Sequence, residues 1–412
     1  MKTKTSILIC FLLGHFTCSA RVIEVGRHQR QSSIQQAINE TVAGDTVWIE
    51  SGLYREKNIV INKSITVIGD RYPIIDGEYR YQMISVKAPG VTIKGLRLIH
   101  TGISSLEDIA AIKLYSVHDV VITDNMIEGA FFGIWAEAST NCRIENNELK
   151  ASSKTEQQSG NGIHCWKCDT MRIIHNKISG HRDGIYFEFV TNSLIWRNIS
   201  EHNLRYGLHF MFSHDDSYIS NIFSNNGAGV SVMFTHGVRM LNNFFEDNWG
   251  DGAFGILLKE ITDSYIIGNK FTNNTSGIFM EGTTRIQVQK NEFRSNGWAM
   301  KIQASCMDIN VTENNFVSNT FDVGTNGTLM LNKFDRNYWD KYEGYDLNKD
   351  NIGDVPFHPV SLFSVIVEKN PSSMILFRSF MTSLLDKTER ILPSLIPENL
   401  KDDYPFMKPL KL

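Results

Sequence analysis

The chain has 412 residues, a formal net charge of −4 and 42% hydrophobic residues, values typical of a soluble protein with a large core. This charge balance provides no concentrated basic surface, so it argues against a nucleic-acid-binding protein. Six cysteines are too few for a disulfide-stabilised scaffold of this length.

Residues 1–20 are typical of a secretory signal peptide. Lys2 and Lys4 precede the apolar run 7–13, and Cys18 and the two residues after it are small enough for cleavage. The apolar run is too short to span a membrane. The residues before Cys18 do not favour a lipoprotein signal. We therefore expect the mature chain to be exported.

A short amphipathic helix is predicted directly after the signal. Ile34, Ala37 and Ile38 recur at helical spacing. A helix at this point would cover the exposed edge of the first strands that follow.

From Val120 to Trp339 one sequence motif recurs about every 22 residues: an apolar strand followed by Asn-x-apolar. Short strands punctuated by Asn and Gly suit one turn of a parallel β-helix, and the crossover rule makes it right-handed. The sequence predicts an all-β solenoid over residues 21–355. The marker residues are Asn125, Asn147, Asn176, Asn198, Asn221, Asn243, Asn269, Asn291, Asn314 and Asn332.

The repeated Asn has a structural interpretation. An inward Asn at the same corner of successive coils can bond the backbone groups that the turn leaves free. Many coils carry a second Asn five residues after the marker Asn. The first of these is Asn203 and the last is Asn337. A column of Phe residues that begins at Phe223 and ends at Phe334 is expected to stack beside the Asn ladder. The polar insertion at residues 150–160 is expected to protrude as a loop.

Strand alternation after each glycine predicts two outward columns on one sheet. In the second position stand His164, Tyr186, His209, Ser231, Leu257 and Phe279, and in the fourth Trp166, Glu188, Met211, Met233, Lys259 and Glu281.

Thioether and imidazole groups in these columns form a soft ligand set that suits Cu(I). The candidate site comprises His209, Met211 and Met233, with His164, His214 and His236 nearby. The alternative is an apolar contact surface for a partner, which would include Tyr186, Leu257 and Phe279.

Two further patterns have the spacing of metal sites. Cys165 and Cys168 match a metal or redox pair, but alternation places Cys165 in the core, so a structural role is favoured. The spacing typical of a calcium-binding loop is found at Asp346, Asn348, Asp350 and Asp354. This loop lacks the usual Gly and the bidentate Glu, so a metal-free Asx-turn loop is an equal alternative.

Residues 356–412 form a separate, partly helical arm. Of its two apolar stretches, residues 362–367 and 374–385, the second has helical spacing. The arm is expected either to cap the last coil or to dock on a partner or membrane surface. The candidate docking residues are Met374, Phe377, Phe380, Met381 and Leu384.

Secreted β-helices include carbohydrate lyases and epimerases, so a carbohydrate-active protein is the alternative function. Such chemistry needs facing carboxylates or a base beside a cation. The only carboxylates in the fourth-position column, Glu188 and Glu281, lie several coils apart. We therefore expect a protein that is not an enzyme.

Several longer strings resemble the NosD family. The most specific are residues 180–189 (GHRDGIYFEF), 203–213 (NLRYGLHFMFS) and 255–261 (GILLKEI). The resemblance extends from Ile34 to about Met407. It implies a periplasmic β-helix accessory protein for maturation of the copper centre of nitrous oxide reductase.

The resemblance also implies partners. They are an ABC transporter permease with its cytoplasmic ATPase, a copper-carrying lipoprotein and nitrous oxide reductase itself. The protein would lie on the outer face of the permease, at the membrane but not in it. It implies a role for copper but no particular metal ligands, and it makes residues 356–412 the expected docking arm.

Overall fold

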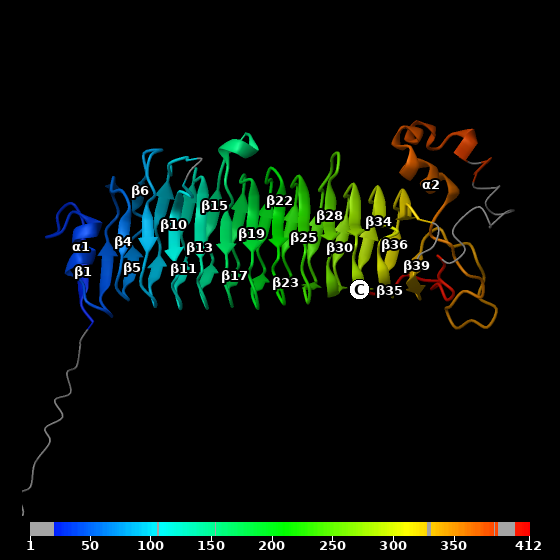
Figure 1. Cartoon of the computed structure of the whole chain (residues 1–412), viewed down its shortest axis with the longest axis horizontal. Coiled ribbons are helices and arrows are strands. Elements are labelled where there is room, and N and C mark those ends of the chain that lie inside the picture. Colours follow the sequence, from blue (N-terminus) through cyan, green and yellow to red (C-terminus); the bar gives the residue numbers. More distant parts are fainter. Residues whose placement is uncertain (1–19, 105–106, 153, 328–330, 383, 386–399) are drawn as a thin grey trace, which may run out of the picture.

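The computed structural model describes residues 20–412 except 105–106, 153, 328–330, 383 and 386–399. The predicted signal peptide lies almost wholly outside the described residues. The described chain winds into a long parallel β-helix with a helix at its first coil and an arm at its last (Figure 1). This confirms the predicted all-β solenoid. Each complete coil contributes one strand to each of three parallel sheets, in a fixed order along the chain, whereas the first and last coils contribute fewer.

The first sheet has 14 strands, and every neighbouring pair is parallel. Its strands are β1 (Val22–Val25), β2 (Thr46–Ile49), β5 (Thr66–Gly69), β8 (Thr92–Lys94), β11 (Val121–Thr123), β14 (Arg143–Glu145), β17 (Arg172–Ile174), β20 (Leu194–Trp196), β23 (Ser217–Ile219), β26 (Arg239–Leu241), β29 (Thr262–Ile267), β32 (Thr284–Gln289), β35 (Met307–Thr312) and β38 (Leu331–Asp335).

The second sheet has 13 strands and follows the first in every coil. Its strands are β3 (Leu53–Tyr54), β6 (Ile74–Asp76), β9 (Arg97–Ile99), β12 (Met126–Glu128), β15 (Glu148–Lys150), β18 (Lys177–Ser179), β21 (Ile199–Glu201), β24 (Ile222–Ser224), β27 (Phe244–Glu246), β30 (Lys270–Thr272), β33 (Glu292–Arg294), β36 (Asn315–Val317) and β39 (Tyr338–Trp339).

The third sheet has 12 strands and carries the predicted outward columns. Its strands are β4 (Ile59–Ile61), β7 (Ile84–Val86), β10 (Ala110–Tyr115), β13 (Phe132–Glu137), β16 (Ile163–Trp166), β19 (Asp183–Glu188), β22 (Tyr206–Met211), β25 (Ala228–Met233), β28 (Phe254–Lys259), β31 (Ser276–Glu281), β34 (Trp298–Ile302) and β37 (Phe321–Gly324).

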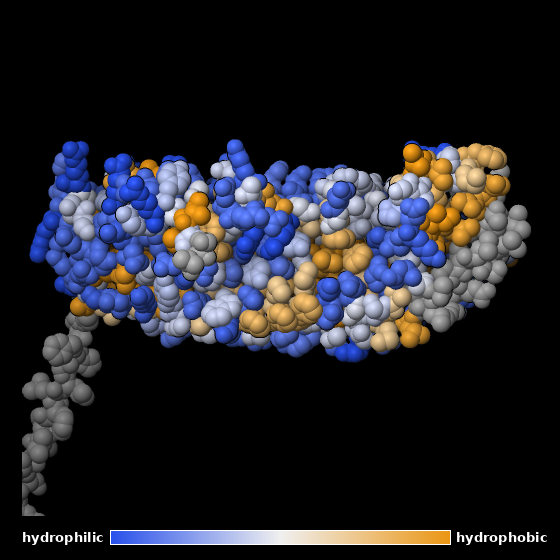
Figure 2. All heavy atoms as spheres, turned by 45° about the horizontal axis from the view of Figure 1, so that its top comes forward, coloured by the Kyte–Doolittle hydropathy of each residue, from blue (hydrophilic) through white to orange (hydrophobic). Residues whose placement is uncertain are grey.

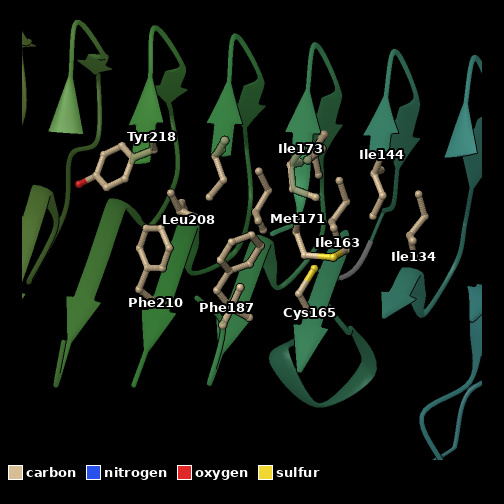
Figure 3. Packing of buried hydrophobic residues seen from close by; sticks show 14 of the residues in the cluster. Ile134, Ile144, Ile163, Cys165, Met171, Ile173, Phe187, Leu208, Phe210 and Tyr218 are labelled. Carbon is tan, nitrogen blue, oxygen red and sulfur yellow. The ribbon is translucent and has the colours of Figure 1, made fainter. Parts of the chain in front are cut away.

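Apolar side chains from all three sheets fill the interior. Figure 3 shows Ile163 and Cys165 followed coil by coil by Phe187 and then by Leu208 and Phe210. These side chains are fully buried. The alternation of apolar inward and more polar outward positions therefore accounts for the core.

The predicted first helix is α1 (Ile34–Glu40). The Ser33 side chain caps it by accepting a hydrogen bond from the Gln36 backbone N–H, and the apolar residues Ile34, Ala37 and Ile38 are buried. The helix contacts β1, β2 and β4 at the first coil. It shields the end of the solenoid, as predicted.

An Asn ladder runs along the corner between the first and second sheets. The backbone N–H and Nδ2 of each Asn donate to Oδ1 of the Asn in the next coil, at 2.8–3.0 Å from Asn125 onward. Every rung is buried. The ladder consists of Asn125, Asn147, Asn176, Asn198, Asn221, Asn243, Asn269, Asn291, Asn314 and Asn337.

The predicted final rung is wrong. Asn332 lies in β38 of the first sheet, where its Oδ1 accepts from the Ile309 N–H, and Asn337 occupies the ladder position instead. The aromatic column shifts in the same way, because Trp339 and not Phe334 stacks on Phe316 at 4.0 Å. The Asn-x-apolar motif occurs twice in this coil, at Asn332 and at Asn337, and only Asn337 lies a full period of 23 residues after Asn314.

The arm is partly helical, as predicted: residues 380–382 and 384–385, in the stretch with helical spacing, are α-helical, and a further helix precedes them. Helix α2 (Leu362–Lys369) packs on β37, where Phe363 and Val367 contact Phe321. A 3₁₀ helix, η2 (Pro371–Leu376), follows it. The only other 3₁₀ helix within the described residues, η1 (Glu156–Gln158), lies in the protruding loop at residues 150–160.

The tail after the arm closes the Asn ladder. Asp402 is fully buried, and its Oδ2 accepts hydrogen bonds from the backbone N–H and Nδ2 of Asn337 and from Nε1 of Trp339. Its Oδ1 accepts from the Arg336 N–H at 3.0 Å. A carboxylate from the tail thus takes the place that the next Asn would fill.

Candidate functional site

The register of the third sheet confirms both predicted columns. His164 pairs with Tyr186, Tyr186 with His209, and His209 with Ser231. In the fourth position Glu188 pairs with Met211, and Met211 with Met233. Leu257 and Phe279 continue the second-position column and are half-buried.

The second-position column is more buried than an outward face requires. His164 stacks on Trp135 with ring centroids 3.8 Å apart, and His209 meets the rings of Tyr186 and Tyr206 at 4.9 and 4.8 Å. Burial lowers the pKa of His164 to about 3, which keeps the imidazole neutral. At 6% and 5% exposure, His164 and His209 are less accessible to an ion on the face of the sheet than the half-buried Met211 and Met233.

A buried charge cluster lies beside His209. Its Nδ1 is 3.7 Å from the Asp183 carboxylate, and Arg205 donates two hydrogen bonds to the same carboxylate at 2.9 and 2.6 Å. Burial alone would raise the pKa of Asp183, but the His209 imidazole and the Arg205 guanidinium outweigh it and lower that pKa. His209 therefore contacts Asp183, away from the two Met side chains.

Met211 and Met233 are more accessible than the two histidines of the second-position column. Both are half-buried and are paired in adjacent strands, which lie roughly 5 Å apart along the solenoid. The Tyr186 hydroxyl donates to Sδ of Met211 at 3.5 Å. The two thioethers remain at the surface of the third sheet.

His214 and His236 lie around the next corner, between the third and first sheets. Their rings are parallel, with centroids 4.2 Å apart. Nδ1 of His236 is 3.8 Å from Asp215, and Nδ1 of His214 is 3.3 Å from the Thr235 hydroxyl. Burial and the neighbouring His236 lower the pKa of His214.

Sequence reasoning missed a stack of three Phe rings on the same corner. Phe189, Phe212 and Phe234 follow one another in successive coils, with centroids 5.3 and 5.1 Å apart and nearly parallel planes. Phe189 and Phe212 are 45% and 37% exposed. The signal was present, because each Phe directly follows the fourth-position residue of its strand.

The backbone of these Phe residues is left-handed, with φ between 49° and 55°. The same corner position is left-handed in neighbouring coils, at Ala138, Lys167 and Glu260, so this conformation belongs to the corner and not to the Phe residues. We call Met211, Met233, Phe189, Phe212 and Phe234 the Met–Phe ridge. An exposed apolar surface of this kind is typical of an interaction site.

Among the described residues no group of three or more His, Cys, Asp or Glu side chains is arranged to hold a metal ion. A soft ion such as Cu(I) would instead use the thioethers of Met211 and Met233, which that set of ligand types does not include. The described cysteines Cys142, Cys165, Cys168 and Cys306 are all buried free thiols. This placement agrees with the structural role favoured for Cys165 and Cys168.

The predicted calcium loop is held by its own backbone. Asp346 accepts hydrogen bonds from the N–H groups of Lys349, Asp350 and Asn351. In the same loop Asp354 accepts from the Leu347 N–H and Asp350 from the Ile352 N–H, while Asn348 contacts Asp350. This network favours the metal-free Asx-turn alternative.

The predicted docking residues of the arm form an apolar surface. Figure 2 shows apolar residues gathered at the C-terminal end of the solenoid. Their exposed fractions range from 37% to 82%. Ile375, which the sequence analysis did not select, is the most exposed large apolar side chain among the arm residues that the structure describes, at 88%. The surface comprises Met374, Ile375, Leu376, Phe377, Phe380, Met381 and Leu384.

In the part of the chain that the structure describes, no helix has the length and apolar character needed to cross a membrane.

Comparison with known proteins connects these surfaces to a family. A family model described as "Periplasmic copper-binding protein (NosD)" matches residues 150–349, which include the Met–Phe ridge. A "Probable ABC transporter binding protein NosD" from Pseudomonas aeruginosa is 26% identical over 385 residues, or 89% of each chain. A protein of the same description from Stutzerimonas stutzeri is 26% identical over 81% of this chain and 80% of its own.

Solved structures share the fold. The surface adhesin PfbA of Streptococcus pneumoniae superposes with a TM-score of 0.58 and 11% identity, over 75% of this chain and 93% of its own. The Dettilon tailspike protein gives the same TM-score and identity over 72% of this chain and 65% of its own. At such low identity these likenesses concern the fold alone.

Proposed function

The chain belongs to the NosD family, and on that premise we propose that it is a periplasmic accessory protein in the maturation of the copper centre of nitrous oxide reductase. It acts beside an ABC transporter, whose permease it contacts on the outer face and whose ATPase is cytoplasmic. A copper-carrying lipoprotein delivers Cu(I), and the reductase receives it. In this proposal the protein binds and positions its partners and catalyses no reaction.

The Met–Phe ridge is the observation that carries the copper role. Two thioethers in adjacent coils offer Cu(I) soft ligands, and the Phe stack gives a protein donor an apolar surface beside them. His214 and His236, around the corner, can add an imidazole ligand during transfer. Copper is here a cargo, held briefly at the surface.

Competitive Cu(I) titration tests this role. Met211→Leu with Met233→Leu keeps the side-chain volume and removes both thioethers. We expect the Cu(I) affinity to fall at least tenfold, whereas Met307→Leu, which changes a 46% exposed Met elsewhere, leaves it unchanged. Equal affinities in all three proteins would refute the copper site.

The apolar arm surface supports contact with the permease. Helix α2 fixes the arm to the last coils through the cluster of Phe321, Phe363 and Val367, and Lys301 pairs with Glu368 at 2.6 Å. The residues beyond it turn their apolar side chains to solvent. An anchored element with an exposed apolar surface suits a permanent membrane-protein partner.

Deleting residues 362–412 would be a poor test, because it also removes Asp402 from the Asn ladder. The substitutions Ile375→Ser and Phe380→Ser change only side chains that are at least 82% exposed. We expect them to abolish co-purification with the permease and to leave the circular dichroism unchanged. Leu53→Ser, at the opposite end of the solenoid, is the matched control; retained co-purification in the double variant would exclude the arm as the main anchor.

A further inference from the structure

A hollow of about 440 Å³ lies over the third sheet near β13, β16 and β19, and at Tyr186 and Glu188 it borders the Met–Phe ridge. The loop that precedes β10 contributes Ile103 and Asp108 to its wall, and the protruding loop contributes Gln157. These insertions turn one part of an otherwise flat sheet face into a walled site. Within the described residues nothing in the fold requires a hollow here.

The hollow is lined by two side chains whose N–H groups lack an acceptor. Trp135 and His164 are 7% and 6% exposed and stack on one another. In the described part of the chain neither Nε1 of Trp135 nor Nε2 of His164 has a hydrogen-bond partner. Buried polar groups are almost always satisfied, so two orphaned groups side by side require an explanation.

The hydrogen bonds of Asn161 define the tautomer of His164. Arg182 donates from Nε to Oδ1 of Asn161 at 3.3 Å, which turns the amide Nδ2 toward Nδ1 of His164, 3.0 Å away. Because an amide nitrogen only donates, Nδ1 accepts and the proton of the neutral ring is on Nε2. Both orphaned groups are therefore donors, and they call for an acceptor.

The other residues that line the hollow indicate which class of acceptor it could bind. The Arg182 guanidinium brings a positive charge and a planar pair of donors that matches a carboxylate. Phe131, Phe132 and the Tyr186 ring supply apolar walls. The carboxylates of Asp108 and Glu188 belong to residues with solvent access, so they can turn outward.

We propose that this hollow binds an organic carboxylate, with the carboxylate group on Arg182 and the two orphaned N–H donors and the apolar body against the Phe walls. The group can come from a free small acid or from the C-terminus of a peptide, since both present the same chemistry. Nothing in this proposal depends on copper or on the arm.

Isothermal titration of the full chain with benzoate tests the proposal. Benzamide, which has the same ring and no negative charge, is the ligand control. A short peptide that ends in Phe with a free carboxylate, and the same peptide amidated, distinguish the second source. We expect saturable binding of benzoate or of the free-carboxylate peptide, and binding at least tenfold weaker for the matching amide.

Two variants locate the site. Arg182→Gln removes the charge, and His164→Phe keeps the stacked ring but removes the N–H; each should weaken binding at least tenfold. Arg197→Gln changes an exposed Arg on the first sheet and should bind as the wild type does. Unfolding midpoints identify any variant that fails to fold, and Arg182→Gln, at a half-buried position, keeps the test valid if His164→Phe does fail.

The opposing outcomes are distinct. If no carboxylate binds, or if Arg182→Gln and His164→Phe bind as tightly as the wild type, the proposal is wrong. If glucose or another neutral sugar binds and the carboxylates do not, the hollow is a saccharide site and the proposal is also wrong.

Discussion

A single rung shows why the solenoid depends on asparagine. Asn243 Oδ1 accepts from the N–H and from Nδ2 of Asn221, and its own Nδ2 donates to the Tyr218 carbonyl at 2.9 Å. The amide thus satisfies groups in the neighbouring coil that the corner leaves without backbone partners. Serine could accept but could not also reach the carbonyl, and aspartate could not donate.

Replacing this rung should be costly. Asn243→Ala leaves the buried Asn221 N–H without an acceptor, which costs about 1–3 kcal/mol, and also removes the hydrogen bonds that the Asn243 Nδ2 donates. We expect the free energy of unfolding, measured by urea denaturation, to fall by about 2–4 kcal/mol. Asn39→Ala, at an exposed position in α1, should change it by less than about 0.5 kcal/mol.

His181 makes stability depend on pH. It is fully buried, neither ring nitrogen has a partner within the described residues, and burial lowers its pKa from 6.5 to about 4. The unfolded chain binds the proton first as pH falls, so the contribution of this neutral ring is complete above pH 6.5 and is lost between pH 6.5 and about 4.

The corresponding variant is His181→Leu, which cannot take up a proton. We expect the loss of unfolding free energy between pH 6.5 and pH 5 to be smaller in this variant by about 2 kcal/mol. The exposed His202→Gln should retain the pH dependence of the wild type. An unchanged slope in His181→Leu would show that this ring titrates normally.

At the scale of the elements, regular features could be predicted from the sequence and irregular ones could not. Alternation and a period of about 22 residues suffice to pair His209 with Tyr186 and Met211 with Met233. The burial of His209 depends on Tyr206 of its own strand and on Asp183 of the previous coil, which a column alignment does not compare. The Phe corner was visible as a spacing, but its left-handed backbone was not.

The C-terminal end of the solenoid was harder to predict because the Asn-x-apolar motif occurs twice in the last coil and the strand pattern ends after it. The last rung of the ladder is Asn337 and not the predicted Asn332. Helix α2 (Leu362–Lys369) is stabilised because Phe363 and Val367 pack against Phe321. The helical spacing at residues 374–385 predicted the helical residues 380–382 and 384–385 that follow, but it gave no sign of α2. Their apolar side chains remain exposed, so the spacing there reflects a surface and not a core.

Substitution of Asp402 tests whether the C-terminal tail is held on the last coil by this carboxylate. Asp402→Ala would leave three buried donors of Asn337 and Trp339 without an acceptor, so we expect the tail to detach from the last coil. Limited proteolysis should then cut residues 356–412 at least tenfold faster. Asp402→Asn keeps one acceptor oxygen and should have a smaller effect, and Asp403→Ala, at an exposed neighbour, should have none.

On the scale of the whole molecule, the solenoid acts as a rigid spacer. The two Met residues of the Met–Phe ridge lie on β22 and β25, and the arm packs on β37 of the same sheet, four strands beyond β25. At roughly 4.8 Å per strand this separation is about 19 Å along the axis. Since every coil is hydrogen-bonded to the next, the distance between the proposed copper face and the proposed permease contact is constant.

Removing one coil tests this spacing. Residues 254–275 comprise one full turn, and their deletion joins partners that already share a register, since Phe254 pairs with Ser276. We expect a folded protein with unchanged Cu(I) affinity and unchanged co-purification with the permease, but with copper loading of the reductase at least tenfold slower. Loading at the wild-type rate would show that the spacing has no role.

The position of Asp402 in the chain also determines the order of assembly. The carboxylate follows the rung that it completes by 65 residues, so a chain that emerges from its N-terminus can stack every coil before the closing group arrives. Until then the last strands present an unpaired edge, which is the kind of surface that templates aggregation. Folding thus begins at a protected end and finishes at a temporarily open one. Chains truncated before residue 402 should fold their coils and then associate through that edge.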